Sequence, residues 1–506
     1  KRSQLGAHFT SREDIELVVD AVVMTVLRRE WEECRQIINN LLTTGRKTPS
    51  ASKASVKPMN AATMRKARGE AESILHGFLI RLQQVRILDP ACGSGNFLYV
   101  VLLRLKDLEK EAILFGNDND LGSFLPMAGP SQLYGIEINS YAHDLAQMTV
   151  WIGWLQWIRV NGFGFPADPI LKPLTDNIRL MDSILGEKGE PEWPAVDFII
   201  GNPPFLGGKL LRRELGDEYV DQMLALWKDR VPAEADLCCY WFEKARAHIA
   251  IGKCKRAGLL ATQGIRGGAN REVLKHIKGN GDIFWAESDR PWILDGANVH
   301  VSMVGFDDGT ETTRTLDGKV VGTINANLTA TADTTKAKLL SANINIFLRP
   351  PEKGGQFDLT DTQALEMLHD PNPHGRSNSD VMRPWVNGES IVKTRQSLWI
   401  IDIAPQLSEG EASCYQKPWQ YVSTHVKPGR GNNRDERLRR LWWIHRRTGE
   451  GVRDASIKFT RLLCTPRVSK HRIFTWIDAI IEPDTAIYAF ACSDDLFFGI
   501  LHSRFH

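Results

Sequence analysis

The chain has 506 residues, 42% of them hydrophobic and 25% charged, with a formal net charge of +2. This composition is ordinary for a soluble globular protein, and no apolar run reaches the roughly 18 residues that a membrane-spanning helix needs. The N-terminus lacks the apolar core of a signal peptide, and the eight scattered cysteines contain no CxxC pair. We therefore expect a cytoplasmic protein of two or three domains, without a metal site or a disulfide framework.

The first 84 residues are predicted to form a helical region. Apolar periodicity predicts helices over 15–42 and 61–82. The segment 43–58 between them is rich in Ser, Thr, Lys and Pro, which predicts a loop.

From residue 85 onward, short apolar runs alternate with helical stretches. Five runs have the pattern of a buried strand that ends in a polar or Gly/Pro turn: 85–90, 131–139, 178–185, 196–204 and 256–263. Strands that alternate with helices predict an α/β fold on a mostly parallel sheet. In such a sheet the ligand lies beyond the carboxyl ends of the strands.

The pattern changes after residue 306. The segment 307–330 has Asp-Gly pairs flanked by Thr and Val, which predicts a hairpin-rich appendage. A Pro-, Asn- and Gly-rich stretch at 368–390 marks a second change of composition. We expect an N-terminal helical region, a catalytic domain and a C-terminal module of mixed α and β character that is incomplete at its end: 1–84, 85–345 and 346–506.

The charge is unevenly distributed. Between Lys417 and Arg472 there are 15 Lys or Arg and 4 Asp or Glu, a local balance of +11 that leaves −9 for the remainder. A basic block of this kind is typical of a surface that binds a polyanion, whereas an ordinary solvated surface would have more acids among the bases.

Four of the predicted strands end in glycine-rich or polar segments: Asp89–Gly95 (DPACGSG), Glu137, Asp182-Ser183 and Asn202-Pro203-Pro204-Phe205. The glycine turn fits neither GxGxxG nor GxxxxGK[ST], so dinucleotide and triphosphate binding are weakly supported. A carboxylate at the second strand end can accept both hydroxyls of a ribose. At the third strand end, Asp182 and Ser183 can accept a hydrogen bond from an exocyclic amine.

The Asn-Pro-Pro-Phe segment is the most specific of these signals. Two successive prolines remove two backbone donors and fix φ, which leaves carbonyl groups for the site. The side-chain oxygen of Asn202 and the carbonyl of Pro203 provide two acceptors, which suits an NH2 group. Phe205 provides an aromatic ring on which a planar base can stack.

The set of motifs resembles a known family. DPACGSG is similar to motif I of the class I S-adenosylmethionine-dependent DNA methyltransferases that methylate amino groups, and NPPF resembles their catalytic motif. GAHFTS, Gly6–Ser11, resembles the motif that precedes motif I in the gamma class and closes over the methionine end of the cofactor. Stretches along nearly the whole chain, among them ATQGIRGGANREVL, KPWQYVSTHVKP and FFGILHSRFH, are similar to the MmeI-like (type IIL) family, which joins restriction and modification in one polypeptide.

The resemblance implies a Rossmann-like class I methyltransferase domain and S-adenosyl-L-methionine as the cofactor. It places the glycine turn and the GAHFTS motif at the methionine part, Glu137 at the ribose, and Asp182 with Ser183 at the adenine. The implied cofactor-binding residues are Phe9, Thr10, Asp89, Pro90, Ala91, Gly93, Gly95, Glu137, Ile138, Asp182, Ser183 and Asn202. The implied catalytic residues are Asn202, Pro203, Pro204 and Phe205, with the first two at the target amine and Phe205 stacked on the flipped base.

The resemblance further implies a C-terminal target recognition domain, and double-stranded DNA as the partner. Candidate DNA contacts there are Arg383, Arg467, Lys470, His471 and Arg472. The nuclease domain of the family has no counterpart in this sequence, since no convincing pair of acidic residues followed by ExK is present. We therefore expect a single chain that methylates N6 of adenine at specific sites without cutting the DNA.

Two other functions stay open at this point. The amine could be N4 of cytosine, although that chemistry more often resembles Ser-Pro-Pro-Tyr. The chain could also be a DNA-binding recognition component with an inactive methyltransferase fold, although the intact set of Asp89, Glu137, Asp182 and Asn202 argues against decay.

Overall fold

The computed structural model describes residues 10–44, 61–162, 173–294, 297–331, 340–393, 398–431, 433 and 435–503. The chain divides into two compact units, Lys1–Ala337 and Lys338–His506. The first unit includes the N-terminal helices, which the sequence alone set apart as a region of their own. Most of the predicted loop 43–58 lies outside the described residues.

The strands of the first unit form one sheet in the order β3-β2-β1-β4-β5-β7-β6-β8-β9. Neighbours from β3 to β5 run parallel, and β7 is antiparallel to both β5 and β6. The predicted Rossmann-like, mostly parallel sheet is therefore confirmed. The strands are β1 (Ile87–Asp89), β2 (Leu133–Glu137), β3 (Ile178–Leu180), β4 (Phe198–Gly201), β5 (Arg256–Thr262), β6 (Asp282–Leu294), β7 (Ala297–Asp307), β8 (Arg314–Leu316) and β9 (Lys319–Val321).

The order of the sheet reverses between β1 and β4. From β1 the chain moves outward through β2 to β3, then returns to the other side of β1 for β4 and β5. In open α/β sheets such a switch point leaves a crevice outside the carboxyl ends of the strands, where ligands bind. The segments that follow β1 and β4 therefore lie side by side at the position where this fold binds its ligands.

The central strands are buried on both faces. Ile87, Phe198 and Ile200 belong to one hydrophobic core, whereas Leu88 and Ile199 belong to another. Successive side chains of a strand point to opposite faces, so the apolar runs of β1 and β4 fill both cores at once. The sheet is the middle layer of a three-layer unit.

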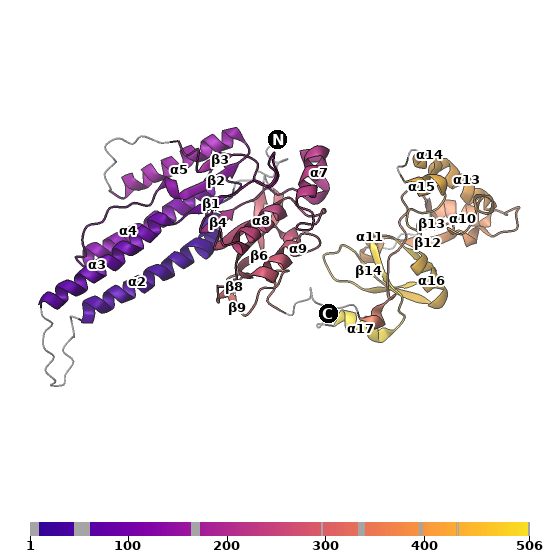
Figure 1. The fold of residues 1–506 in the computed structure, drawn as a ribbon. Helices are drawn as coiled ribbons and strands as arrows, with labels where there is room; N and C mark the ends of the chain where they lie inside the picture. The colour runs from indigo at the N-terminus through magenta and orange to yellow at the C-terminus, as the bar shows by residue number, and fades with distance from the viewer. Residues whose placement is uncertain are drawn as a thin grey trace. The chain divides into compact units, whose positions relative to one another are not determined.

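Helices cover both faces of this sheet. The first core contains residues of α1, α2, α3, α4 and α5, and the second contains residues of α7, α8 and α9. Figure 1 shows α2, α3 and α4 lying side by side. Their bounds are α1 (Arg12–Val19), α2 (Thr25–Thr44), α3 (Ala61–Gln84), α4 (Asn96–Asp118), α5 (Ser140–Val160), α6 (Leu211–Leu215), α7 (Asp217–Leu226), α8 (Cys238–Ala250) and α9 (Arg271–Asn280).

The predicted N-terminal helices are confirmed, with one addition. A single π-helical segment, Asp20–Met24, joins α1 to α2. Val18 and Val22 of this region pack against Gly258 of β5, where an added Cβ would lie 2.3 Å from Cγ2 of Val22. The glycine lets the helix approach the sheet closely, so the end of α1 and the π-helical segment pack against β5.

The hairpin predicted in 307–330 is also confirmed. β8 and β9 pair antiparallel on either side of Asp317 and Gly318, which have φ values of +49° and +73°. Two central residues with positive φ are the mark of a type I′ turn, for which Asp-Gly is a preferred pair.

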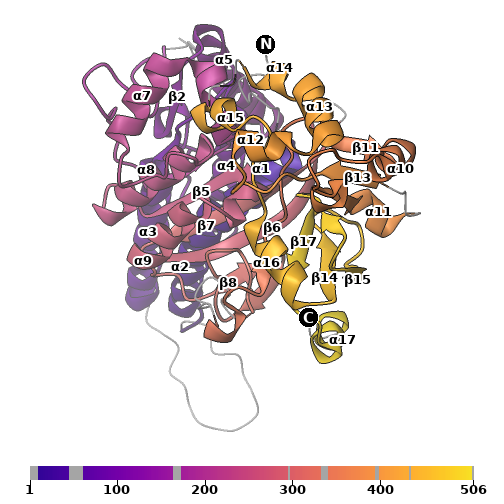
Figure 2. The same cartoon turned by 90° about the vertical axis from the view of Figure 1, so that its right-hand side faces the viewer.

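The second unit contains two four-stranded sheets within its described residues, in the orders β10-β17-β14-β15 and β11-β13-β12-β16. Figure 2 shows β14, β15 and β17 in yellow and β11 with β13 in orange. Helices accompany both sheets, so the predicted mixed α/β character is confirmed. The strands are β10 (Phe347–Leu348), β11 (Asp358–Thr360), β12 (Met382–Val386), β13 (Leu398–Ile401), β14 (Arg461–Pro466), β15 (Thr475–Asp478), β16 (Glu482–Pro483) and β17 (Ile487–Phe490). The helices are α10 (Asp361–His369), α11 (Gly388–Val392), α12 (Glu409–Ser413), α13 (Gln416–His425), α14 (Lys427–Arg430), α15 (Glu436–Arg440), α16 (Glu450–Lys458) and α17 (Asp495–His502).

Across the described ranges, no helix is both long enough and apolar enough to cross a bilayer. The same ranges contain no group of three or more His, Cys, Asp or Glu side chains placed to hold a metal ion.

Candidate active site

The glycine turn after β1 forms a tight loop that leads into α4. Gly93 and Gly95 have φ values of +53° and +84°, a region that side-chain-bearing residues rarely adopt. The amide of Gly95 donates to the carbonyl of Cys92 at 2.8 Å, and the amide of Cys92 donates to Ile136 of β2 at 3.0 Å. A Cβ on Gly95 would also lie 3.1 Å from the backbone of Ala146 in α5. The turn therefore needs glycine for its backbone conformation and for packing.

Asp89 ends β1 as a buried carboxyl group. Its side chain is 1% exposed and accepts the amide of Ala91 at 3.1 Å. Burial, with a smaller contribution from the charge of Glu137, raises the pKa of Asp89 to about 8, against the opposing effect of the Ala91 amide. The next residue is held as well, because the indole of Trp241 in α8 donates to the carbonyl of Pro90 at 3.0 Å.

Glu137 joins the ends of β1 and β2. One carboxylate oxygen accepts the amide of Gly93 and the other accepts the amide of Asn139, both at 2.8 Å. Each oxygen keeps a second lone pair for a ligand. The neighbouring Ile138 is 68% exposed and offers an apolar surface at the same strand end.

Asp182 is held in place within the loop after β3. One oxygen accepts the amides of Ile184 and Leu185 at 2.8 and 2.9 Å, and the other accepts the hydroxyl of Tyr219 at 2.7 Å. Burial, reinforced by Asp182, raises the pKa of Tyr219, so this hydroxyl stays a donor. Oγ of Ser183 is buried and has no hydrogen-bond partner among the residues that the structure describes.

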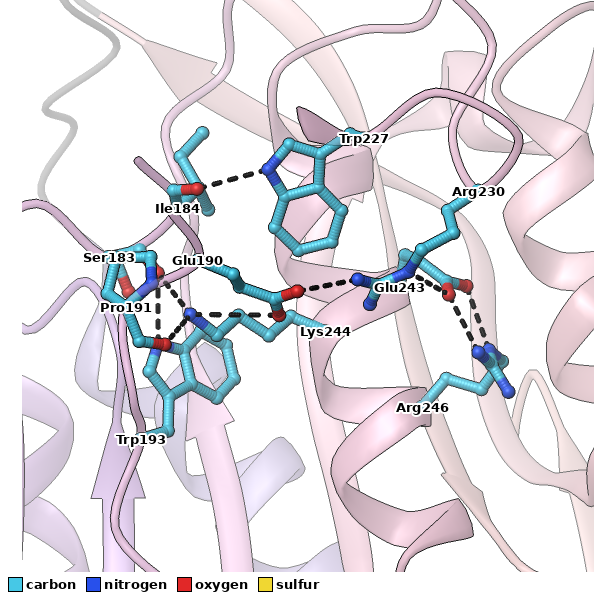
Figure 3. Close-up of polar contacts among 10 residues, drawn as sticks. All are labelled: Ser183, Ile184, Glu190, Pro191, Trp193, Trp227, Arg230, Glu243, Lys244 and Arg246. Atoms are coloured by element: carbon cyan, nitrogen blue, oxygen red, sulfur yellow. Dashed lines mark hydrogen bonds and ion pairs between the residues drawn. The ribbon is translucent and has the colours of Figure 1, made fainter. Parts of the chain in front are cut away.

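A buried lysine on α8 supports this loop through hydrogen bonds to its backbone (Figure 3). Nζ of Lys244, on α8, donates to the carbonyls of Ser183 at 2.8 Å and Pro191 at 2.6 Å. The indole of Trp193 donates to the same Ser183 carbonyl at 3.0 Å, and Trp227 donates to the carbonyl of Ile184 at 3.0 Å. The side chains of Lys244, Trp193 and Trp227 thus fix the backbone of the loop. The side chains of Asp182 and Ser183 stay at the end of the strand.

An ion-pair network extends from this lysine. Arg230 pairs with Glu190 at 2.6 Å and with Glu243 at 3.1 Å, while Glu190 lies 4.0 Å from Lys244. Glu243 is 1% exposed and also pairs with Arg246 at 2.7 Å. Figure 3 shows the dashed contacts running from the Ser183 loop to Arg246.

The lysine makes the stability of the fold depend on pH. Burial lowers the pKa of Lys244 to about 7, with Glu190 and Asp182 opposing the shift and Arg230 adding to it. Between about pH 7 and the usual lysine value near 10.4, the unfolded chain binds the extra proton, so the free energy of unfolding rises with pH. Between about pH 7 and 9, the free energy of unfolding of the wild type should rise by roughly 2 kcal/mol more than that of Lys244→Met, as measured by urea unfolding.

A matched control is Lys253→Met, which removes an exposed amine paired with Glu192 at 3.0 Å. We expect this variant to keep the pH profile of the wild type. A parallel profile for Lys244→Met and the wild type would contradict the assigned titration.

Asn202 follows β4 directly and lies beside the glycine turn at the switch point. Its amide Nδ2 donates to Oγ1 of Thr10 at 3.1 Å. Its Oδ1 is buried and finds no hydrogen-bond partner in the described part of the chain. A buried acceptor without a donor costs free energy and in native structures requires an explanation, such as a role toward a ligand.

The rest of the Asn-Pro-Pro-Phe segment is positioned by its neighbours. Pro203 is buried, and the ring of Phe205 packs edge-on against Trp292 of β6, with centroids 6.1 Å apart. Beyond it, the amide of Gly208 donates to Asp236 at 3.0 Å, and Asp236 is bonded in turn to Asn270 at 2.7 Å. These contacts hold the loop that leaves the site.

The predicted cofactor-binding residues are thus brought together around the ends of β1, β2, β3 and β4. Thr10 joins them through Asn202, although the two are 192 residues apart. Phe9 lies outside the described residues.

Sequence reasoning missed several residues that support the site: Trp241, Lys244, Tyr219 and Trp292. Lys244 could have been noticed in the sequence, because it lies among the apolar residues of a helix and a buried lysine needs partners. Tyr219 and Trp292 could not, since their contacts depend on the tertiary packing.

Of the predicted DNA contacts, Arg383 lies on β12 and faces acids. Its guanidinium is 3.8 Å from Asp402 and 3.9 Å from Glu482, both of which are buried. Burial raises the pKa of Glu482 to about 7. This arginine therefore takes part in a charge network inside the second unit.

The other predicted contacts form an exposed loop between β14 and β15, Arg467–Arg472. Nη1 of Arg467 donates to the carbonyl of Thr485 at 3.0 Å, and Arg472 donates to that of Ser503 at 3.3 Å. Elsewhere the basic block 417–472 is partly neutralised by acids outside it, as in the pairs Arg446–Glu352, Arg447–Glu352, Arg453–Asp402, Arg461–Asp495 and Lys417–Asp370.

Comparison with known proteins places this arrangement in context. A family model of the MmeI DNA-methyltransferase domain matches residues 64–317, slightly more than half of the chain. The solved structure of the type IIL restriction-modification enzyme MmeI in complex with DNA matches with a TM-score of 0.68 at 20% identity. That match covers 99% of this chain and 65% of the MmeI chain, and it shows a shared fold.

Two relatives match in sequence. DNA methyltransferase A of Bacillus subtilis (strain 168) is 29% identical over 248 residues, which cover 46% of this chain and 27% of that protein. A putative type II restriction enzyme and methyltransferase of Methanocaldococcus jannaschii is 31% identical over 123 residues, or 23% of this chain and 10% of that protein. The chain spans less than two thirds of the length of each of these proteins. The chain belongs to the MmeI family of DNA-methyltransferase domains, in which S-adenosyl-L-methionine is the methyl donor.

Proposed function

We propose that this chain is a site-specific DNA methyltransferase of a restriction-modification system. It transfers a methyl group to the exocyclic N6 of an adenine that is flipped out of duplex DNA. The proposal rests on the position of Asn202. This residue directly follows β4, the strand that pairs with β1, and β1 leads into the glycine turn. Its Oδ1 is buried and has no hydrogen-bond donor in the described ranges. A cytoplasmic location is part of the proposal, because the DNA substrate is found there.

The residues at the strand ends fit S-adenosyl-L-methionine. Oγ of Ser183 is a buried hydroxyl that no described residue bonds, and it lies in the loop assigned to the adenine. The glycine turn leaves its backbone open to a ligand, since no described residue beyond its chain neighbours comes within 4 Å of a Cβ added at Gly93. Glu137 would hold the ribose, Asp89 with the glycine turn the methionine part, and Ile138 the face of the adenine.

When bound, the cofactor supplies an electrophilic methyl group on a sulfonium. The target nitrogen cannot be reached within a base pair, so the base must leave the stack at a cost of a few kcal/mol. Oδ1 of Asn202 and the carbonyl of Pro203 would accept the two amine hydrogens. This draws the nitrogen lone pair out of conjugation and directs it at the methyl group, which is catalysis by positioning and electrostatics.

The target base needs a surface once it has left the stack. Phe205 would supply it, with its ring already held edge-on by Trp292. Stacking on an aromatic ring is worth about 1–3 kcal/mol per base, which offsets much of the cost of flipping. The proton leaves the nitrogen after the methyl group is attached, so the site needs no strong base.

Binding to DNA is proposed for the exposed loop Arg467–Arg472 of the second unit. Three phosphate contacts would give a slope of about −2.7 for the logarithm of affinity against the logarithm of salt concentration. Lys470→Ala should make that slope less steep by about 1, as measured by fluorescence anisotropy with duplex DNA. Arg446→Ala is the control, since Arg446 already pairs with Glu352 at 2.9 Å, and its slope should equal that of the wild type. Equal slopes for the wild type and Lys470→Ala would rule out a phosphate contact by Lys470.

The decisive experiment is methylation of duplex DNA by the purified chain with labelled cofactor, followed by nucleoside mass spectrometry and mapping of the modified positions. We expect N6-methyladenine at a defined sequence. N4-methylcytosine as the product would reassign the target base. Cofactor binding without any methylated product would instead favour a recognition component with an inactive methyltransferase fold.

A further inference from the structure

Three carboxyl groups lie at the strand ends of the site, and none of them is paired with a cation. Asp89, Glu137 and Asp182 are held by hydrogen bonds from amides and one hydroxyl, and none forms an ion pair with a described Lys, Arg or His. Uncompensated acids suit a ligand of net positive charge and disfavour a phosphate. S-adenosyl-L-methionine is such a ligand, because its sulfonium and ammonium outweigh its single carboxylate.

The three groups differ in how well hydrogen bonds support a negative charge. Asp182 accepts two amides and the hydroxyl of Tyr219, and Glu137 accepts two amides. Among the described residues, Asp89 is bonded by one donor, the amide of Ala91 at 3.1 Å, and it is 1% exposed. A buried carboxylate without a paired charge is costly and takes up a proton instead. Asp89 is therefore the least stable of the three as an anion.

The groups around Asp89 do not favour its ionisation. Glu137 faces it from the end of β2, and the buried thiol of Cys92 lies in the same turn. On β4 it meets Gly201, where an added Cβ would lie 2.4 Å from its Oδ1, and Trp241 of α8 donates to the carbonyl of the next residue. None of these groups is a cation. Because burial raises the pKa of Asp89 to about 8, the carboxyl group is mostly protonated at neutral pH.

A cation bound at the glycine turn reverses this balance. An opposite charge within about 4–6 Å lowers the pKa of a carboxyl group by up to about 3. The methyl donor carries such a charge on its sulfonium, whereas S-adenosylhomocysteine, its product, has a neutral thioether in that position. The ammonium and carboxylate of the methionine part are common to both. The donor therefore favours the ionised form of Asp89, and the product does not.

We propose that Asp89 distinguishes the cationic methyl donor from its neutral product, losing its proton to the solvent when the donor binds and keeping it when the product binds. The inference rests on the proposed placement of the methionine part at the glycine turn. It deepens that proposal, because it assigns Asp89 to the choice between the two forms of the cofactor. Once the sulfur is neutral, Asp89 takes a proton back from the solvent, which favours replacement of the product by a new donor molecule.

The test is calorimetry of S-adenosylmethionine and of S-adenosylhomocysteine with the full chain, without DNA, in two buffers of different ionisation enthalpy. At pH 7 the donor should release roughly 0.8–0.9 proton per site, and the product less than about 0.2. Between pH 6 and 7 the ammonium of the cofactor stays protonated. In this range the affinity for the donor should rise by about 5- to 10-fold, because the donor binds the ionised form of Asp89, and the affinity for the product should change by less than about twofold.

Asp89→Asn replaces the carboxyl group with a neutral group of the same shape. It should release less than about 0.2 proton with either ligand, and its preference for the donor should not change between pH 6 and 7. Asp307→Asn is the matched control. Burial raises the pKa of Asp307 as well, but this residue pairs with Arg256 at the opposite edge of the sheet. The control should release as many protons as the wild type, and thermal unfolding checks that both variants are folded.

Equal proton release by donor and product, or undiminished release by Asp89→Asn, would overturn the inference. So would binding of the donor to the wild type with less than about 0.2 proton released at pH 7. Failure of the proposed function has a different signature, since the donor would then bind with proton release while the chain methylates no DNA. A wild type that does not bind the donor at all would overturn both.

Discussion

Replacing Asn202 with alanine is expected to lower the single-turnover rate of DNA methylation by about 10² to 10³-fold, the usual cost of losing one preorganised hydrogen-bonding group at a reacting centre. Oδ1 of Asn202 is buried and meets no donor among the described residues, so the substitution removes an acceptor that is in place before the substrate binds. The loss should appear at saturating cofactor and DNA, because the lost interaction belongs to the transition state.

Cofactor binding should survive this substitution, as measured by calorimetry, because Asp89, Glu137 and Ser183 are untouched. Asn177→Ala is the matched control: its amide is also bonded, to the carbonyl of Ser131 at 2.9 Å, but it precedes β3 at the opposite end of the sheet. Undiminished methylation by Asn202→Ala would remove Asn202 from the catalytic assignment.

The second large effect is expected for Gly201→Ala. Gly201 is the last residue of β4, and a Cβ there would lie 2.4 Å from Oδ1 of Asp89. Asp89 is fully enclosed and cannot retreat without losing the amide of Ala91. We expect a loss of about 1–3 kcal/mol of unfolding free energy in urea titrations, the usual cost of overpacking a core.

The same substitution should weaken cofactor binding, because the side chain that it displaces begins the glycine turn. Gly207→Ala is the control from the same loop, since among the described residues its Cβ would meet only Asp236 within 4 Å, at 3.7 Å, and its φ is −65°. That variant should match the wild type in both measurements. Wild-type stability of Gly201→Ala would show that Asp89 has room to move.

Much of this site could be predicted from the sequence, because its residues follow directly after strands. The apolar runs before Asp89, Glu137 and Asn202 fixed the strand ends, and the parallel sheet brings such ends to one edge. Motif spacing therefore sufficed to place these side chains near one another. It did not reveal that Glu137 already binds the amide of Gly93, since that contact depends on the register of β1 against β2.

Contacts across long stretches of chain could not be predicted. The bond between Thr10 and Asn202 requires α1 to lie on β5, and that packing depends on Gly258, which has no distinctive sequence context. The basic block was the least informative signal. Charge counted along the sequence cannot show that Glu352, far from the block in sequence, neutralises two of its arginines.

The burial of β1 and β4 on both faces has a consequence for the motions of the protein. Amides of Leu88 and Ile199, at the centre of the sheet, are covered by two separate cores, so they should exchange with deuterium only when the whole unit unfolds. The residues proposed to react, Asn202 and Pro203, directly follow the end of β4, one of these strands. We therefore expect thermal fluctuations that open the outer helices to leave the distance between the glycine turn and Asn202 unchanged.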